Sequence, residues 1–220
     1  MKLKKIASLM LAGVMAVSML AGCSGNGSNN NNNNDEDPVV NTGMAGKVIA
    51  ALDKDTTDKV AFTASSSLET TLQKAVQNVG TDISNSKMAA NILDALLKVD
   101  TDLTSKAIPQ ATSNSKATDK EEQSVTTVTV LDKANIGSDE NYASKALAAA
   151  VEGFKADGVH TLAKLEADSV IYTDNDGKNY WYNFTYTGDM AVIEVTDSVT
   201  GQSTYVVAYT ITRTPAEQYQ

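Results

Sequence analysis

Residues 178–213 read KNYWYNFTYTGDMAVIEVTDSVTGQSTYVVAYTITR, and this stretch decides the fold. It is rich in β-branched and aromatic residues, which favour strands, and glycine-containing pairs typical of hairpin turns interrupt it. Together with the residues just before it, the stretch predicts strands near 168–173, 178–187, 190–196 and 203–213. The turns are expected at Asn175-Asp176-Gly177, Gly188-Asp189 and Thr200-Gly201. Since gaps this short join antiparallel neighbours, the sequence predicts an antiparallel meander sheet.

A strand and a helix are expected immediately upstream of the meander. Val125 to Leu131 is rich in β-branched residues, and Ser138 can cap a helix that Gly158 can end. Apolar residues recur along this helix at helical spacing, at Ala143, Ala146, Leu147, Ala150, Val151 and Phe154. Residues 124–214 are therefore expected to form a strand, a helix and an antiparallel meander, with the helix packed on one face of the sheet.

The preceding region, residues 41–108, is expected to be mainly helical. Three stretches place apolar residues at the spacing of an amphipathic helix: 45–52, 68–79 and 88–99. Ser66 and Glu69 have the spacing of a capping box ahead of the second helix, and Gly80 can end it. N-terminal amphipathic helices followed by a meander sheet indicate an α+β fold.

Two further segments complete the predicted organisation of the folded region. Val60 to Thr63 predicts a short strand between the first two helices. Residues 109–123 contain no large apolar side chain, so we expect a loop or linker there, and residues 215–220 are expected to form a tail. The pattern leaves open whether the helical and sheet regions share one core or form two.

The N-terminal residues have the composition of a secretory signal peptide. Lys2, Lys4 and Lys5 precede an apolar run from Ile6 to Met19, and small residues follow it. The run is shorter than the roughly 20 apolar residues that a membrane-spanning helix needs. A positive head followed by such a run predicts export of the rest of the chain, with the lysines retained on the cytoplasmic side.

The run Leu20-Ala21-Gly22-Cys23, which contains the single cysteine, resembles the lipobox of bacterial membrane lipoproteins. The resemblance covers only the first 23 residues. It implies that residues 1–22 are removed and that Cys23 becomes the first mature residue, carrying a diacylglyceryl lipid. Since two acyl chains suffice for stable anchoring, the resemblance implies a protein held at the bacterial cell membrane, facing the extracytoplasmic side. No cofactor other than this covalent lipid is expected.

Residues 23–40 are expected to be a disordered tether behind the lipid. Ser24 to Asp37 is rich in Gly, Ser and Asn and contains no apolar residue to bury. Loss of residues 1–22 removes three lysines and no acid, so the net charge of the chain falls from −9 to about −12. Because this charge repels phosphate backbones and Arg213 is the only arginine, nucleic acid is not expected as a partner.

The aromatic stretch 180–186 contains the strongest candidates for ligand contact. Since side chains alternate along a strand, Tyr180, Tyr182, Phe184 and Tyr186 share one face, and Trp181 lies on the other. The aromatic face can stack on sugar rings or peptide, which suits an envelope glycan or protein partner. Alternatively, it packs on the helix that carries Leu147 and Val151, and Trp181 is then the better candidate for an exposed contact.

No catalytic residue and no metal ligand can be assigned from the sequence. His160 is the only histidine and follows the expected end of a helix, so a loop position is predicted for it. The segment from Asp174 to Gly177 resembles part of a calcium loop, but a full loop would place Tyr172 at its first position and Asn183 at its twelfth. A hairpin turn explains this segment better.

Three classes of function remain open. The first is a non-enzymatic module that binds a ligand or protein or has a structural role in the envelope. The second is an envelope hydrolase that uses two carboxylates. The third is the solute-binding component of a transporter, for which two similar lobes hinged at residues 109–123 would be expected. The sequence does not indicate an oligomeric state.

Overall fold

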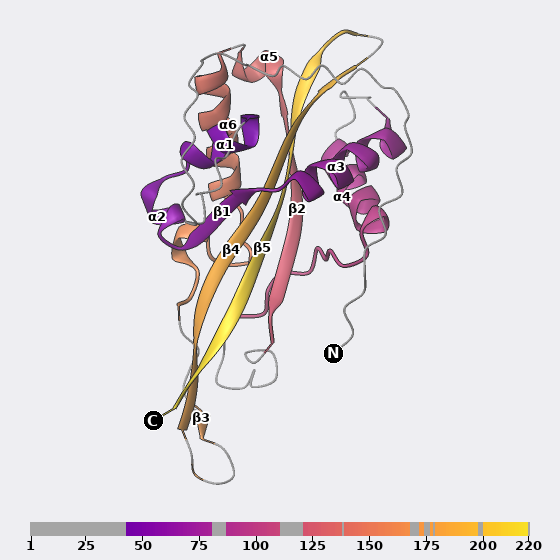
Figure 1. The fold of residues 1–220 in the computed structure, drawn as a ribbon. Coiled ribbons are helices and arrows are strands. Elements are labelled where there is room, and N and C mark those ends of the chain that lie inside the picture. Colours follow the sequence, from indigo (N-terminus) through magenta and orange to yellow (C-terminus); the bar gives the residue numbers. More distant parts are fainter. Residues whose placement is uncertain are drawn as a thin grey trace, which may run out of the picture. The chain divides into compact units, whose positions relative to one another are not determined.

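The computed structural model describes residues 43–80, 87–110, 121–137, 139–167, 172–173, 177, 179–197 and 200–219 (Figure 1). Cys23, the rest of the lipobox and the Asn-rich tether lie outside the described residues. The same holds for Ser138, for the segment from Asp174 to Asp176 and for residues 111–120 of the expected linker.

A five-stranded mixed sheet forms the centre of the fold, with the strand order β1-β4-β5-β2 and β3 paired to β4. The strands are β1 (Val60–Ala64), β2 (Gln123–Asp132), β3 (Tyr172–Thr173), β4 (Asn179–Thr196) and β5 (Ser203–Tyr219). β4 and β5 form a long antiparallel hairpin, and β2 pairs antiparallel with β5. Among the strands in the described part of the chain, β1 alone runs parallel to its neighbour, β4. The α+β class with a mostly antiparallel sheet is therefore confirmed.

The predicted turn at Gly188-Asp189 is wrong, because β4 runs unbroken through it. Gly188 lies opposite Phe62 of β1, and a β-carbon on Gly188 would lie 2.4 Å from the Phe62 ring. The glycine therefore provides space for a neighbouring ring and not a turn, a role that glycine also has within strands. The turn at Thr200-Gly201 is confirmed: Gly201 has a φ of 70° and joins β4 to β5.

The C-terminal strand is longer than expected. β5 continues through residues 215–219, which the sequence assigned to a tail, and Gln218 pairs with Trp181. The strand expected near 168–173 is present only as Tyr172–Thr173 within the described residues. Two long strands thus replace the three that were expected between residues 178 and 213.

The helices are α1 (Gly43–Ala50), α2 (Lys54–Thr57), α3 (Ser66–Val79), α4 (Met88–Val99), α5 (Lys133–Ile136) and α6 (Glu140–Glu152), with a 3₁₀ turn at Leu162–Lys164. The three amphipathic helices of the first half are confirmed as α1, α3 and α4. The N-cap of α3 is Ser65 and not Ser66, since its hydroxyl accepts a hydrogen bond from the backbone N–H of Leu68. Gly80 ends α3, as predicted.

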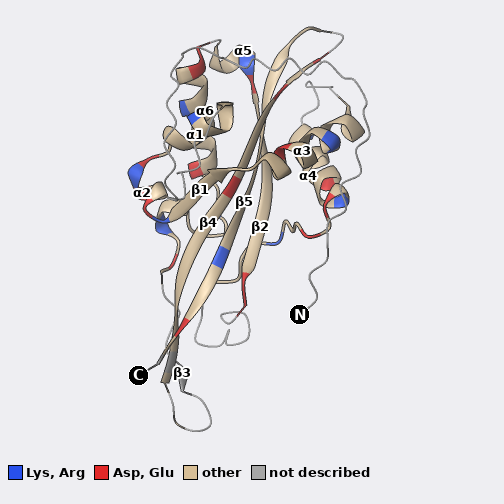
Figure 2. Ribbon diagram, viewed as in Figure 1, with Lys and Arg blue, Asp and Glu red and all other residues tan. Residues whose placement is uncertain are grey.

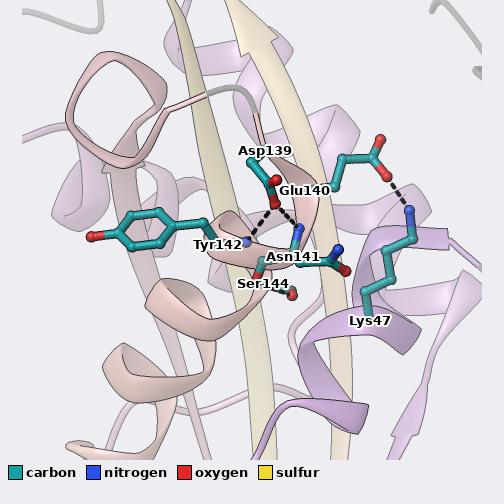
Figure 3. Close-up of polar contacts among 6 residues, drawn as sticks. All are labelled: Lys47, Asp139, Glu140, Asn141, Tyr142 and Ser144. Carbon is teal, nitrogen blue, oxygen red and sulfur yellow. Dashed lines mark hydrogen bonds and ion pairs between the residues drawn. The ribbon is translucent and has the colours of Figure 1, made fainter.

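The helix α6 begins and ends differently from the prediction. Its N-cap is Asp139, whose carboxylate accepts hydrogen bonds from the backbone N–H groups of Asn141 and Tyr142 at 2.9 and 3.0 Å (Figure 3). These two hydrogen bonds satisfy backbone N–H groups that have no partner within the first turn of the helix. The helix ends at Gly153, five residues before Gly158, which has a φ of 80° in the following loop.

Helices cover both faces of the sheet, with α1 and α6 on one face and α3 and α4 on the other (Figure 1). Successive side chains of β5 point to opposite faces of the sheet, so this strand contributes to both cores. Val207 and Tyr209 pack with α6, whereas Val206 and Ala208 pack with α3 and α4. The described residues from 43 to 219 form one compact unit. The fold therefore contains one sheet with a core on each face.

Two polar contacts join α1 and the segment after it to α6. Lys47 of α1 forms an ion pair with Glu140 at the start of α6 (Figure 3), and the backbone N–H of Asp53 donates to the carboxylate of Glu152 at its end. With β1 paired to β4, these contacts join the predicted helical region to the sheet region.

Candidate functional site

The four sequence-predicted contact residues, Tyr180, Trp181, Tyr182 and Tyr186, all lie on β4. Tyr182 and Tyr186 are buried, with exposed fractions of 3% and 6%, and they share a core with Leu147 and Val151 of α6. Both side chains therefore lie in the core with the helix, as the alternative for the aromatic face expected, and neither is exposed at the surface. Trp181 lies on the opposite face and is half-buried. The side chain of Tyr180 is outside the described part of the structure.

The single arginine of the chain, Arg213, is buried on the same face of the sheet, on the strand next to Tyr186. Arg213 of β5 is 1% exposed, and its guanidinium carbon lies 4.4 Å from the centre of the Phe184 ring. Its Nη1 donates a hydrogen bond of 2.8 Å to the carbonyl oxygen of Pro109. The arginine thus connects the start of the 109–123 segment to the sheet by a cation–π contact and a charge-assisted hydrogen bond.

Two buried tyrosines on the same face of the sheet stay neutral. Burial raises the pKa of Tyr186 to about 12, although the nearby charge of Arg213 and its hydrogen bond oppose this shift. Burial also raises the pKa of Tyr209 well above its ordinary value. Because desolvation disfavours a phenolate, both side chains act as hydrogen-bonding core residues and not as bases.

Asp157 and His160 form a hydrogen-bonded pair in the loop after α6. The Asp157 carboxylate is 2.7 Å from the Nδ1 atom of His160 and accepts hydrogen bonds from the backbone N–H groups of Val159 and His160. Burial alone would raise the pKa of Asp157. The hydrogen bonds from His160 and Val159 outweigh burial and hold the pKa below its ordinary value.

Asp157 and His160 correspond to two of the three parts of a catalytic triad. A carboxylate at Nδ1 would orient the imidazole for proton transfer at Nε2. Among the described residues, however, no hydroxyl or thiol is hydrogen-bonded to Nε2 of His160. The pair instead closes the loop that follows α6, where Asp157 is 7% exposed.

An open groove of about 300 Å³ lies between α3 and α4. It is lined by Asn78, Val79, Asn91, Asp94, Ala95 and Lys98.

The described residues include no cluster of three or more His, Cys, Asp or Glu side chains suited to a metal ion. No helix in the described part of the chain has the length and hydrophobicity needed to cross a bilayer.

One accessible polar surface of the sheet lies on the face opposite Tyr182 and Tyr186, and we call it the hydroxyl face. It consists of Thr63, Ser124, Trp181, Asn183, Thr185, Thr187, Asp189, Thr212, Thr214 and Gln218. Each of these side chains is exposed or half-buried. The alternation of side chains along β4 predicted which residues share a face with Trp181. The residues of β1, β2 and β5 that extend this surface follow only from the pairing of these strands in the structure.

No protein-family model, no curated protein and no solved structure matches this chain.

Proposed function

We propose that this protein is an extracytoplasmic lipoprotein, anchored to the bacterial cell membrane through a diacylglyceryl group on Cys23. The observation that carries the proposal is the run Leu20-Ala21-Gly22-Cys23 directly behind a lysine-headed apolar segment. The apolar segment accounts for export, and the lipobox accounts for a cysteine at this position. Two acyl chains on one residue provide enough buried CH₂ groups for stable anchoring.

We further propose that the folded part is a non-enzymatic module that binds a ligand or protein or supports the envelope structurally. The polar groups best suited to chemistry take part in holding the fold together. Arg213 donates to the carbonyl of Pro109, and Asp157 bonds to His160 and the backbone beside it. The hydroxyl face, in contrast, presents polar side chains to the surroundings, which favours binding over catalysis.

Membrane fractionation of a lipobox variant tests the anchor. Cys23→Ala removes the sulfur that would be alkylated, so we expect this variant to lose metabolic labelling by palmitate and to leave the membrane fraction. Ser24→Ala is the matched control, since it changes the next residue and keeps the lipobox intact. Equal labelling and equal membrane retention of Cys23→Ala and the unmodified protein would contradict the proposal.

A turnover assay tests the non-enzymatic part independently of the anchor. We expect the purified protein to release no product from glycans, peptides or esters. Turnover of any of these by the purified protein would refute a non-enzymatic role and favour a carboxylate-dependent hydrolase.

A further inference from the structure

We propose that the hydroxyl face binds a neutral glycan chain that lies along the strands. This inference names the partner class of the binding module proposed above and therefore depends on that proposed function. Four observations carry it: the register of the hydroxyl groups, the position of Trp181, the charge of the surface and the extent of the helices that cover the sheet.

The hydroxyl groups stand in rows across neighbouring strands. Thr187 of β4 pairs with Thr212 of β5, which pairs with Ser124 of β2. One row along, Thr185 pairs with Thr214. Strands lie about 4.8 Å apart, and side chains on one face recur at about 6.8 Å along each strand. Since a hydroxyl both donates and accepts hydrogen bonds, such rows suit a ligand that is itself covered with hydroxyl groups.

The only tryptophan of the chain lies at one end of this surface. Trp181 is half-buried and pairs with Gln218, whose amide can donate and accept. A flat aromatic ring provides apolar area for the C–H face of a sugar ring, and its edge can still bond to a polar group. From Trp181 to Asp189 the strand spans about 27 Å, a length that accommodates several sugar units.

The charge of the surface selects against anionic polymers. Asp189 is its only ionisable residue, and its carboxylate accepts a hydrogen bond of 3.1 Å from Thr63. At the edge, Glu122 accepts a hydrogen bond of 3.0 Å from Thr214. Few charged residues interrupt β4 and β5 (Figure 2), and no lysine or arginine belongs to the hydroxyl face. A surface with carboxylates and no cation repels phosphate-containing chains and accepts a neutral partner.

The helices α3 and α4 cover only the other half of this sheet face. Ala191 and Val195 of β4 are buried in the core with these helices, whereas Thr185 and Thr187 are exposed. The described residues thus leave the hydroxyl face open.

The hydroxyl face contains a single large apolar side chain, Trp181, whereas the centre of a protein interface is apolar. The sheet is also twisted (Figure 1), which fits one chain along the strands better than a flat crystalline surface.

Calorimetric titration of the full-length protein in detergent micelles tests the proposal. The probes are cellohexaose, chitohexaose, xylohexaose and mannohexaose, with a soluble polyphosphate as the anionic comparison. We expect saturable binding of at least one neutral hexasaccharide and no binding of polyphosphate. Trp181 is the only tryptophan, so its fluorescence emission should change along the same titration curve.

Variants locate the binding surface. Thr187→Val keeps the shape and strand preference of the side chain but removes the hydroxyl, so it should weaken binding about 3- to 10-fold, as expected for one lost hydrogen bond. Trp181→Ala should weaken it further. Thr70→Val, a control on the exposed side of α3, should leave the dissociation constant unchanged.

The proposal is overturned if no neutral hexasaccharide binds, if polyphosphate binds more tightly, or if Thr187→Val and Thr70→Val bind equally well. Circular dichroism spectra confirm that each variant is folded before titration. Palmitate labelling of Cys23 is independent of these titrations, so failed glycan binding with an intact lipid anchor rejects this inference alone.

Discussion

The contact between Gly188 and Phe62 gives the sharpest prediction about the fold. A β-carbon at Gly188 would lie 2.4 Å from two ring atoms of Phe62, and Phe62 is itself buried at 8% exposure. In an open strand, Gly188→Ala would stabilise the protein by about 0.5–1 kcal/mol, because alanine loses less backbone entropy. Here the overpacking costs about 1–3 kcal/mol. We therefore expect Gly188→Ala to lower the free energy of unfolding.

Urea denaturation and thermal melting measure this effect. A net loss of about 1 kcal/mol lowers the melting temperature of a domain of this size by about 2–4 °C. The variant Phe62→Ala removes the ring, so Gly188→Ala should no longer lower the stability in that background. A double-mutant cycle should therefore give a coupling free energy of at least about 1 kcal/mol between the two positions.

Gly153→Ala provides the matched control. Gly153 has a φ of −69°, and its nearest neighbours would lie at 3.5 Å or more from a β-carbon. This substitution should therefore stabilise the protein by about 0.4–1 kcal/mol. If Gly188→Ala proves as stable as the parent, or costs the same with and without the Phe62 ring, the reason given for the continuous strand is refuted.

Three further predictions concern the buried polar groups. Arg213→Met removes the donor to Pro109 and should lower the free energy of unfolding in urea by about 1–3 kcal/mol; an unchanged urea midpoint would contradict this role. Because the pKa of Asp157 is lowered from 3.8, its stabilising effect is present above that pH and is lost as the pH falls below it. Asp157→Asn should therefore flatten the acid side of the stability profile. Because the pKa of Tyr186 is raised from 10.0 to about 12, its stabilising effect is lost between these pH values, and Tyr186→Phe should reduce the loss of stability at alkaline pH.

Local sequence patterns predicted most of the helices and strands. The periodicity of Leu68, Leu72 and Val76 identified α3, and these residues are buried as their spacing requires. Alternation in β4 assigned Trp181 and Tyr182 to opposite faces. These predictions succeeded because the spacing of side chains along one element depends only on the geometry of that element.

The errors concern partners that lie far away in the chain. Gly188-Asp189 has the composition of a hairpin turn, but its partner Phe62 lies more than a hundred residues earlier in the sequence. The parallel pairing of β1 with β4 likewise joins residues from opposite ends of the folded region. A glycine that provides space for a distant ring and a glycine that forms a turn look alike in a local pattern.

By itself, the sequence determined the class of each major element, the acidic balance of the chain and the lipobox on which the proposed anchor rests. Only the tertiary structure decided that the helices divide between two faces of one sheet, that Arg213 is buried against Phe184, and that Thr185 and Thr187 belong to a wider polar surface. The physical reason is that periodicity depends on neighbouring residues, whereas burial and surface composition depend on which strands pair across the sheet.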